Sequence, residues 1–138
     1  MDYTNPGQDI DITRWTAQEA YRSRSYATKC DVWSFGCLMW EIVTLGKTKV
    51  SFSLDDRKIN YFLGATPYAS LSTSEVPVRV TKGLRLGQAK GISDDLYQLM
   101  LECWQFDLDE RPTFYSLGQS LSQMSQQHLK VTDNSHRS

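Results

Sequence analysis

Few residues of this chain have both the type and the spacing that metal binding or nucleophilic catalysis requires. The three cysteines, Cys30, Cys37 and Cys103, are scattered, with no paired spacing and no histidine close by. A zinc site needs a tighter cluster of ligands, so we interpret them as free thiols of a reducing compartment. The two histidines, His128 and His136, lie in a polar C-terminal stretch and are expected to be exposed side chains without a catalytic role.

Length and charge indicate one small globular domain whose net charge does not favour binding to polyanions. The 138 residues carry a formal net charge of −1, with 40% hydrophobic and 22% charged residues. Nucleic acids and anionic membranes attract basic surfaces, so neither is an expected partner. The longest apolar run, 32–45, is too short to cross a bilayer, and the N-terminus lacks the features of a signal peptide.

The apolar pattern predicts a mainly helical protein built around one central helix. Between residues 32 and 45 apolar side chains recur on all sides of a helix, which is typical of a fully buried helix. Asp31 suits its first turn and Gly46 its end. Four or five helices are expected in all, the others being a short turn within 15–21, a helix within 74–82, a helix capped by Ser93 and a last helix beginning at Pro112.

Three strings occur in the order and spacing of a known family. They are Arg14-Trp15-Thr16-Ala17-Gln18-Glu19-Ala20, then Thr28-Lys29-Cys30-Asp31-Val32-Trp33-Ser34-Phe35-Gly36, and finally Cys103-Trp104 followed by Arg111-Pro112-Thr113-Phe114. Together they resemble the C-terminal lobe of protein tyrosine kinases, of the receptor type more than the cytoplasmic type. The resemblance implies the helical lobe of the protein-kinase fold, incomplete, without the N-terminal β-lobe.

This resemblance also divides the chain into regions. Residues 1–125 would be a partial tyrosine kinase domain, running from the end of the activation segment to the last helix. Residues 47–64 would be an inserted loop within it. Residues 126–138 are polar and are expected to form a disordered tail.

The resemblance assigns the first string to substrate binding. Thr13, Arg14, Trp15 and Thr16 would belong to the loop that positions the substrate tyrosine. Tyr3 falls where an activation-loop tyrosine lies in some receptor kinases, which makes it a candidate phosphorylation site. The alternative is that Tyr3 is an unmodified residue of a frayed end.

Three charged residues would be structural by the same resemblance. Glu19 would be the glutamate of the Ala-Pro-Glu motif, paired with Arg111 in the interior of the lobe. Asp31 would hold the backbone of the catalytic loop from the central helix. The alternatives are that Glu19 and Arg111 are separate surface charges and that Asp31 only complements a helix N-terminus.

The chain departs from the family at three positions. Gln18 stands where the motif has proline, Ile12 stands where a proline usually precedes Trp15, and Leu108 replaces the proline usual before Arg111. These changes weaken the assignment of the substrate loop. The replacement of the motif proline by Gln18 is also compatible with a degenerate kinase.

The parts that perform phosphoryl transfer are missing. Kinases use a glycine-rich loop, a strand lysine, a His-Arg-Asp string with a later Asn, and an Asp-Phe-Gly string. None occurs here, since Phe35-Gly36 follows Ser34 and both histidines lie near the C-terminus. These parts belong upstream of Tyr3, so we expect no catalytic, cofactor-binding or metal-binding residue in this chain, with Mg-ATP bound only by a complete parent.

Three functions stay open at this point. The leading one is a fragment of a tyrosine kinase that phosphorylates protein substrates in signalling, on the cytoplasmic side of the membrane where the parent is a receptor. The second is the C-terminal lobe of a pseudokinase that acts as a docking module. The third is a short product that competes for kinase partners.

Residues 47–64 interrupt the family pattern. Deleting them would join Thr44-Leu45-Gly46 directly to Ala65-Thr66-Pro67-Tyr68, as in tyrosine kinases. The codons that can encode the two ends of this segment include intron-like boundaries, and removal between them keeps the reading frame. We therefore hypothesise that 47–64 is a retained intron. The alternative is a lineage-specific loop. Either way a disordered surface loop without a site of its own is expected.

Overall fold

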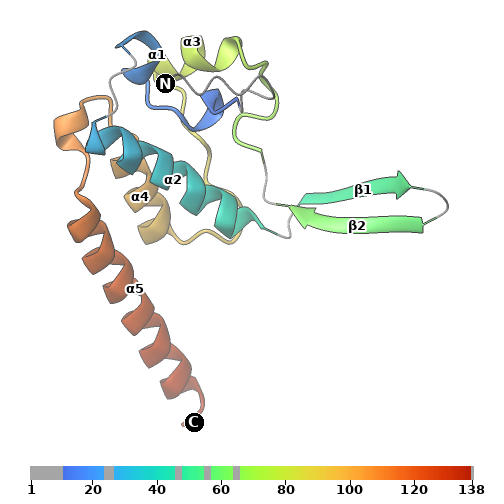
Figure 1. Ribbon diagram of the computed structural model, residues 1–138. Coiled ribbons are helices and arrows are strands. Elements are labelled where there is room, and N and C mark those ends of the chain that lie inside the picture. Colours follow the sequence, from blue (N-terminus) through green and yellow to red (C-terminus); the bar gives the residue numbers. More distant parts are fainter. Residues whose placement is uncertain (1–10, 24–26, 46–47, 55–56, 64–65, 138) are drawn as a thin grey trace, which may run out of the picture.

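A computed structural model describes residues 11–23, 27–45, 48–54, 57–63 and 66–137 (Figure 1). For the strands and for Ser23 it describes the backbone alone. The elements are η1 (Thr13–Trp15), α1 (Ala20–Ser23), α2 (Thr28–Thr44), β1 (Thr48–Leu54), β2 (Arg57–Leu63), α3 (Glu75–Thr81), α4 (Asp94–Cys103), η2 (Leu108–Glu110) and α5 (Phe114–Ser135).

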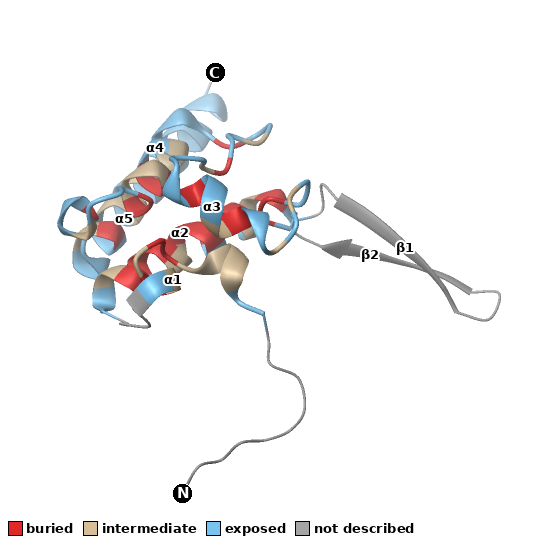
Figure 2. Ribbon diagram, turned by 90° about the horizontal axis from the view of Figure 1, so that it is seen from above, coloured by how far each residue is buried: buried red, intermediate tan, exposed pale blue. Residues whose placement is uncertain are grey.

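The helix α2 is the centre of the fold, as predicted. It packs along α4 and also contacts η1 and η2. Val32, Trp33 and Cys37 are almost fully buried, and the buried residues of Figure 2 concentrate on α2 and the helices beside it. The described helices therefore form the helical lobe that the sequence pattern and the family resemblance imply.

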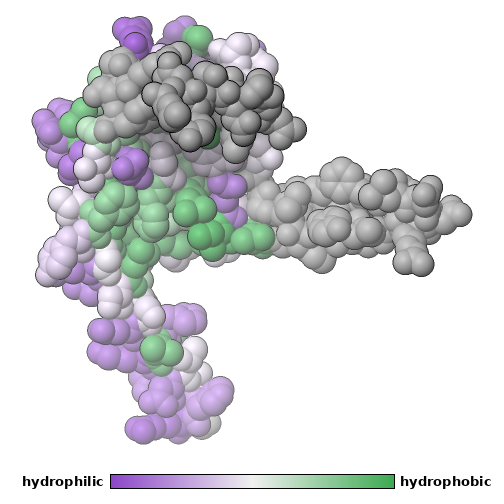
Figure 3. Space-filling model, viewed as in Figure 1, coloured by the Kyte–Doolittle hydropathy of each residue, from purple (hydrophilic) through white to green (hydrophobic). Residues whose placement is uncertain are grey.

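The expectation that α2 is covered on every side is wrong for the described residues. Leu38, Ile42 and Leu45 are 47%, 56% and 55% exposed. Figure 3 shows apolar surface gathered over this part of the molecule. No described element covers these side chains, which is why a helix that is apolar all round is buried on only part of its circumference.

The close approach of α2 and α4 depends on Gly36. A Cβ atom added at Gly36 would lie 2.7 Å from the indole nitrogen of Trp104 and 2.8 Å from Cβ of Cys103. Both distances are well inside normal van der Waals contact. Glycine costs helix stability, but at this position it lets the two helices touch.

The caps of the later helices follow the sequence signals. Ser93 accepts a hydrogen bond from the backbone N–H of Leu96 and so begins α4, as predicted. At α5 the cap is Thr113, whose side chain accepts from the Ser116 N–H while Ser116 accepts from the Thr113 N–H. The last helix thus begins at Phe114, two residues later than the predicted start at Pro112.

The C-terminal stretch is helical where a disordered tail was expected. The helix α5 continues to Ser135, so 126–135 extends the helix that Leu117 holds against the core. The residues from Ser125 to Arg137 are exposed. Propagation of an existing helix adds one hydrogen bond per residue fixed, so the extension forms without a packing partner.

The segment 47–64 also differs from its expected disordered loop. The strands β1 and β2 pair antiparallel, with Phe52 opposite Ile59 and Leu54 opposite Arg57, and the hairpin projects away from the helices (Figure 1). Alternating apolar and polar residues over 50–54 in β1 are a period-two signal that favours a strand. Its two possible origins, and the absence of a site in it, stay predictions.

Glu19 and Arg111 form a bidentate ion pair. Arg111 donates from Nη1 to Oε1 of Glu19 over 2.6 Å and from Nη2 to Oε2 over 2.9 Å. Its side chain is fully buried, while that of Glu19 is a quarter exposed. Partial burial is the largest single influence and opposes the charge on Glu19, but the hydrogen bonds from Arg111, a backbone hydrogen bond, the positive charge of Arg111 and the Cys30 thiol together outweigh it and lower the pKa of Glu19.

Two further properties of the described helices concern disulfide bonds and membrane crossing. All three cysteines are buried, and none forms a disulfide. None of the helices in the described ranges combines the length and the hydropathy that a membrane crossing needs.

Replacing Gly36 by alanine should separate packing from helix propensity. We expect Gly36→Ala to lower the free energy of unfolding by about 1–3 kcal/mol, because the new methyl group overpacks the contact with Trp104. The matched control is Gly118→Ala in α5, where nothing lies within 4 Å of the added Cβ, so a gain of about 0.5–1 kcal/mol is expected. Denaturant unfolding followed by tryptophan fluorescence measures both, and equal shifts would contradict the packing argument.

Removing Glu19 should leave a buried charge without its carboxylate. Glu19→Ala is expected to cost about 3 kcal/mol, whereas Glu110→Ala, at an exposed glutamate, should change stability by less than about 0.5 kcal/mol. Because the pKa of Glu19 is lowered on folding, its contribution is present above its ordinary value of 4.5 and is lost as the pH falls through the folded-state value. The difference between wild type and Glu19→Ala should therefore shrink on acidification; a constant difference would argue against the ion pair as its source.

The uncovered side of α2 should make the purified chain associate. Exposed apolar patches drive association, and a charged side chain in the patch opposes it. We expect concentration-dependent oligomers in sedimentation velocity that the double variant Leu38→Glu, Ile42→Glu abolishes. The double variant Leu129→Glu, Val131→Glu, at exposed positions of α5, is the control and should leave association unchanged. A wild-type chain that stays monomeric at high concentration would disprove the expectation.

Candidate functional site

The segment Thr13–Thr16 is held against the loop before α3 by one arginine. Arg14 donates from Nη1 to the carbonyls of Pro67 and Tyr68, over 3.1 and 2.8 Å, and from Nη2 to the carbonyl of Leu71 over 2.8 Å. All three acceptors are backbone oxygens, so the guanidinium fixes the path of both segments at once. This makes Arg14 the residue that joins η1 to 67–71.

Trp15 ties the same segment to the central helix. Its indole N–H donates to a carboxylate oxygen of Glu41, and its carbonyl accepts a 2.9 Å hydrogen bond from Ser34 Oγ. Both partners lie on α2. The segment is therefore held on two sides, by α2 and by the loop before α3.

Polar groups line the outer edge of the segment. The backbone N–H of Thr13 donates to Asp11, and Thr16 Oγ1 donates to the carbonyl of Ile12 over 2.7 Å. Hydrogen bonds from the side chain and backbone of Thr13 lower the pKa of Asp11, which keeps this exposed carboxyl ionised. The segment therefore presents a fixed polar surface, and its role toward a substrate stays a prediction.

The other predicted site residues are spread over the lobe. Asp31 is exposed in the first turn of α2, and its role toward a catalytic loop stays a prediction. Glu19 and Arg111 are brought together, as described above. Tyr3 lies outside the described residues.

Gln18, at the proline position of the motif, has a structural role of its own. Its side chain is almost fully buried, and its amide nitrogen donates to the carbonyl of Phe106 over 3.0 Å. The proline that the family has here could not make this contact. The departure therefore comes with a bond between the segment before α1 and the turn after α4.

Sequence reasoning missed two cations that bind backbone carbonyls. Arg85 donates to the carbonyls of Trp104 and Val80, over 2.8 and 2.9 Å, and its guanidinium lies 4.7 Å from the centre of the Trp33 ring. Lys29 donates to the carbonyl of Arg111. For Arg85 the available signal is a single cation between Leu84 and Leu86.

The described residues do not fit a magnesium–nucleotide complex. They contain no group of three or more His, Cys, Asp or Glu side chains able to hold a metal ion. The chain also has no glycine-rich phosphate loop. The inactivity of this chain in phosphoryl transfer stays a prediction.

Known proteins match the chain over most of its length. The model of the family described as protein tyrosine and serine/threonine kinase matches residues 1–121. The tyrosine-protein kinase Abl of Drosophila melanogaster is 34% identical over 114 residues, and the transforming protein Fps of Fujinami sarcoma virus is 36% identical over 115; each alignment covers 83% of this chain. The tyrosine-protein kinase receptor Tie-1 of Danio rerio is 34% identical over 113 residues, 82% of the chain.

These relatives are longer than this chain. The matched part is 6% of Abl, 11% of Fps and 52% of Tie-1. The match includes all three sequence strings and the segments that Arg14 and Arg111 bind. The chain belongs to the protein tyrosine and serine/threonine kinase family and represents the helical lobe of its catalytic domain.

Proposed function

We propose that this chain is part of a protein tyrosine kinase whose complete domain transfers the γ-phosphate of ATP to tyrosine in protein substrates, with Thr13–Thr16 positioning the substrate. The observation that carries the proposal is the Arg14 guanidinium, which holds this segment to the carbonyls of Pro67, Tyr68 and Leu71. A segment fixed before substrate arrives orients the reacting group without a further entropic cost. The relatives described as tyrosine kinases support the choice of tyrosine.

The chain alone is proposed to be inactive. Phosphoryl transfer needs a phosphate cradle, metal ligands and a residue that accepts the hydroxyl proton, and the strings that supply them are absent from the sequence. Mg-ATP would bind only to a longer protein that contains them. The partners of that longer protein would be protein substrates and docking proteins. Its kinase domain would be cytoplasmic, and if the parent is a receptor, the domain would lie on the cytoplasmic side of the plasma membrane.

The second candidate is a pseudokinase lobe that serves as a docking module. The observation in its favour is Gln18, which replaces the motif proline and is built into the fold through Phe106. Such a module would keep the Glu19–Arg111 pair and the Arg14 contacts, since these are structural.

Kinase assays on this chain and on the longer protein separate the two candidates. We expect no ATP-dependent tyrosine phosphorylation by the chain alone, and transfer by the longer protein that contains it. In the longer protein, Arg14→Ala should raise the KM for a tyrosine peptide by at least about tenfold and leave the KM for ATP unchanged, because the loss is one of positioning.

Arg22→Ala, at an exposed arginine of α1, is the matched control and should behave as wild type. Transfer by the chain alone would overturn its proposed inactivity. No transfer by the longer protein would favour the docking module. An Arg14→Ala variant with unchanged peptide KM would remove the segment Thr13–Thr16 from substrate positioning.

A further inference from the structure

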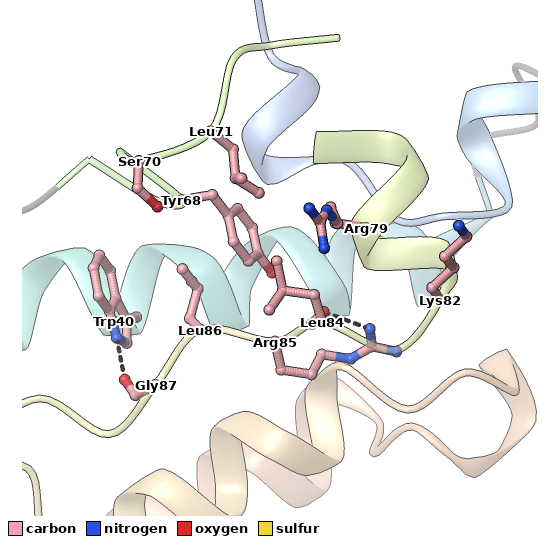
Figure 4. A pocket seen from close by; sticks show the side chains of 10 residues that line it. All are labelled: Trp40, Tyr68, Ser70, Leu71, Arg79, Lys82, Leu84, Arg85, Leu86 and Gly87. Atoms are coloured by element: carbon pink, nitrogen blue, oxygen red, sulfur yellow. Dashed lines mark hydrogen bonds between the residues drawn. The ribbon is translucent and has the colours of Figure 1, made fainter. Parts of the chain in front are cut away.

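A cavity of about 640 Å³ lies between the end of α2, α3 and residues 84–87 (Figure 4). Its size falls within the range of small-molecule sites. Its apolar lining comes mainly from Trp40, Leu71, Leu84 and Leu86. The indole N–H of Trp40 donates to the carbonyl of Gly87 over 2.9 Å, which holds this wall in place.

One polar group in the lining has no partner. Tyr68 is 9% exposed, and its hydroxyl is buried without a hydrogen bond to any described residue. The backbone N–H of Leu86 lies nearby, but not in hydrogen-bonding geometry. Burial raises the pKa of Tyr68, so the phenol stays protonated and can donate a hydrogen bond. An unpaired buried hydroxyl is costly, which makes it a marker of a missing partner.

The backbone at Tyr68 is also unusual. Its φ angle is +53°, in the left-handed region that residues other than glycine seldom adopt. Arg14 holds this conformation by binding the carbonyl of Tyr68. A strained residue that keeps a buried polar group unpaired is typical of a binding site and not of a region selected for stability alone.

The charged residues of the lining are all basic. Arg79, Lys82 and Arg85 contribute to it, and none of the described lining residues is acidic. Arg85 is engaged by three backbone carbonyls, but Arg79 and Lys82 are exposed. Glu75, one turn before Arg79, accepts hydrogen bonds from Ser72 through Oε2. Arg79 forms no ion pair within the described part of the chain.

We propose that this cavity binds a small amphipathic carboxylate, whose apolar body packs against Trp40 and the leucines and whose carboxylate binds Arg79 and the Tyr68 hydroxyl. An apolar pocket with a few convergent polar groups suits such a ligand, and Tyr and Arg supply the donors that a carboxylate accepts. Figure 4 shows Tyr68 between Leu71 and Leu86, with Arg79 approaching from α3. The ligand reaches the hydroxyl by displacing a wall side chain, and Leu84, 40% exposed, has room to rotate.

Calorimetric titration of the chain with 2-naphthoate tests the proposal. We expect saturable binding with one site per chain. The neutral isostere 2-naphthamide should bind at least about tenfold more weakly, because it cannot form the charged hydrogen bonds. Equal affinity for the two probes, or no saturable binding of 2-naphthoate at millimolar concentration, would overturn the proposal.

Two variants test the assigned donors. Arg79→Ala should weaken 2-naphthoate at least about tenfold with little effect on 2-naphthamide, while Lys130→Ala, at an exposed lysine of α5, should change neither. Tyr68→Phe should weaken 2-naphthoate and leave the Tm of the unliganded chain unchanged or higher, since the hydroxyl lost has no partner. Unaltered affinity for 2-naphthoate in both Arg79→Ala and Tyr68→Phe would remove the site from this cavity.

Discussion

Arg111 puts a buried positive charge where distant segments of the chain meet. Besides Glu19, its guanidinium donates to the carbonyls of Gln105 and Lys29, over 3.0 and 2.9 Å. A buried charge is tolerated only with its partners in place, so the segment before α1, the start of α2 and the turn after α4 must be positioned together. The lobe can form correctly only when these three segments have assembled around one side chain.

Trp33 extends this constraint across the core. The guanidiniums of Arg111 and Arg85 lie 5.0 and 4.7 Å from the centre of its ring, and each also binds backbone carbonyls. Arg85 and Arg111 thus bind loop carbonyls and also face the indole of Trp33. In this way they connect the loops around α2 and α4 to the apolar core. The loops that carry the candidate site and the cavity are thus held by the same packing that stabilises the helices.

Local signals in the sequence were enough for most of the helices. Ser93 caps α4 as predicted, and the apolar run at 32–45 corresponds to α2, because caps and periodicity depend on neighbouring residues. The hairpin was missed, although Val50, Phe52 and Leu54 alternate with polar residues, since the family comparison indicated a loop there. The contacts of Arg14 could not be predicted, because its acceptors are backbone carbonyls and any residue type supplies those.

The buried thiols have a consequence for reactivity. Burial raises the pKa of Cys37 and of Cys103 to about 12, and it raises the pKa of Cys30 as well. Only the thiolate attacks electrophiles, so these sulfurs are chemically silent at neutral pH while the lobe is closed. They become reactive when the packing that buries them opens. The rate at which an alkylating reagent labels them therefore reports how often the core opens.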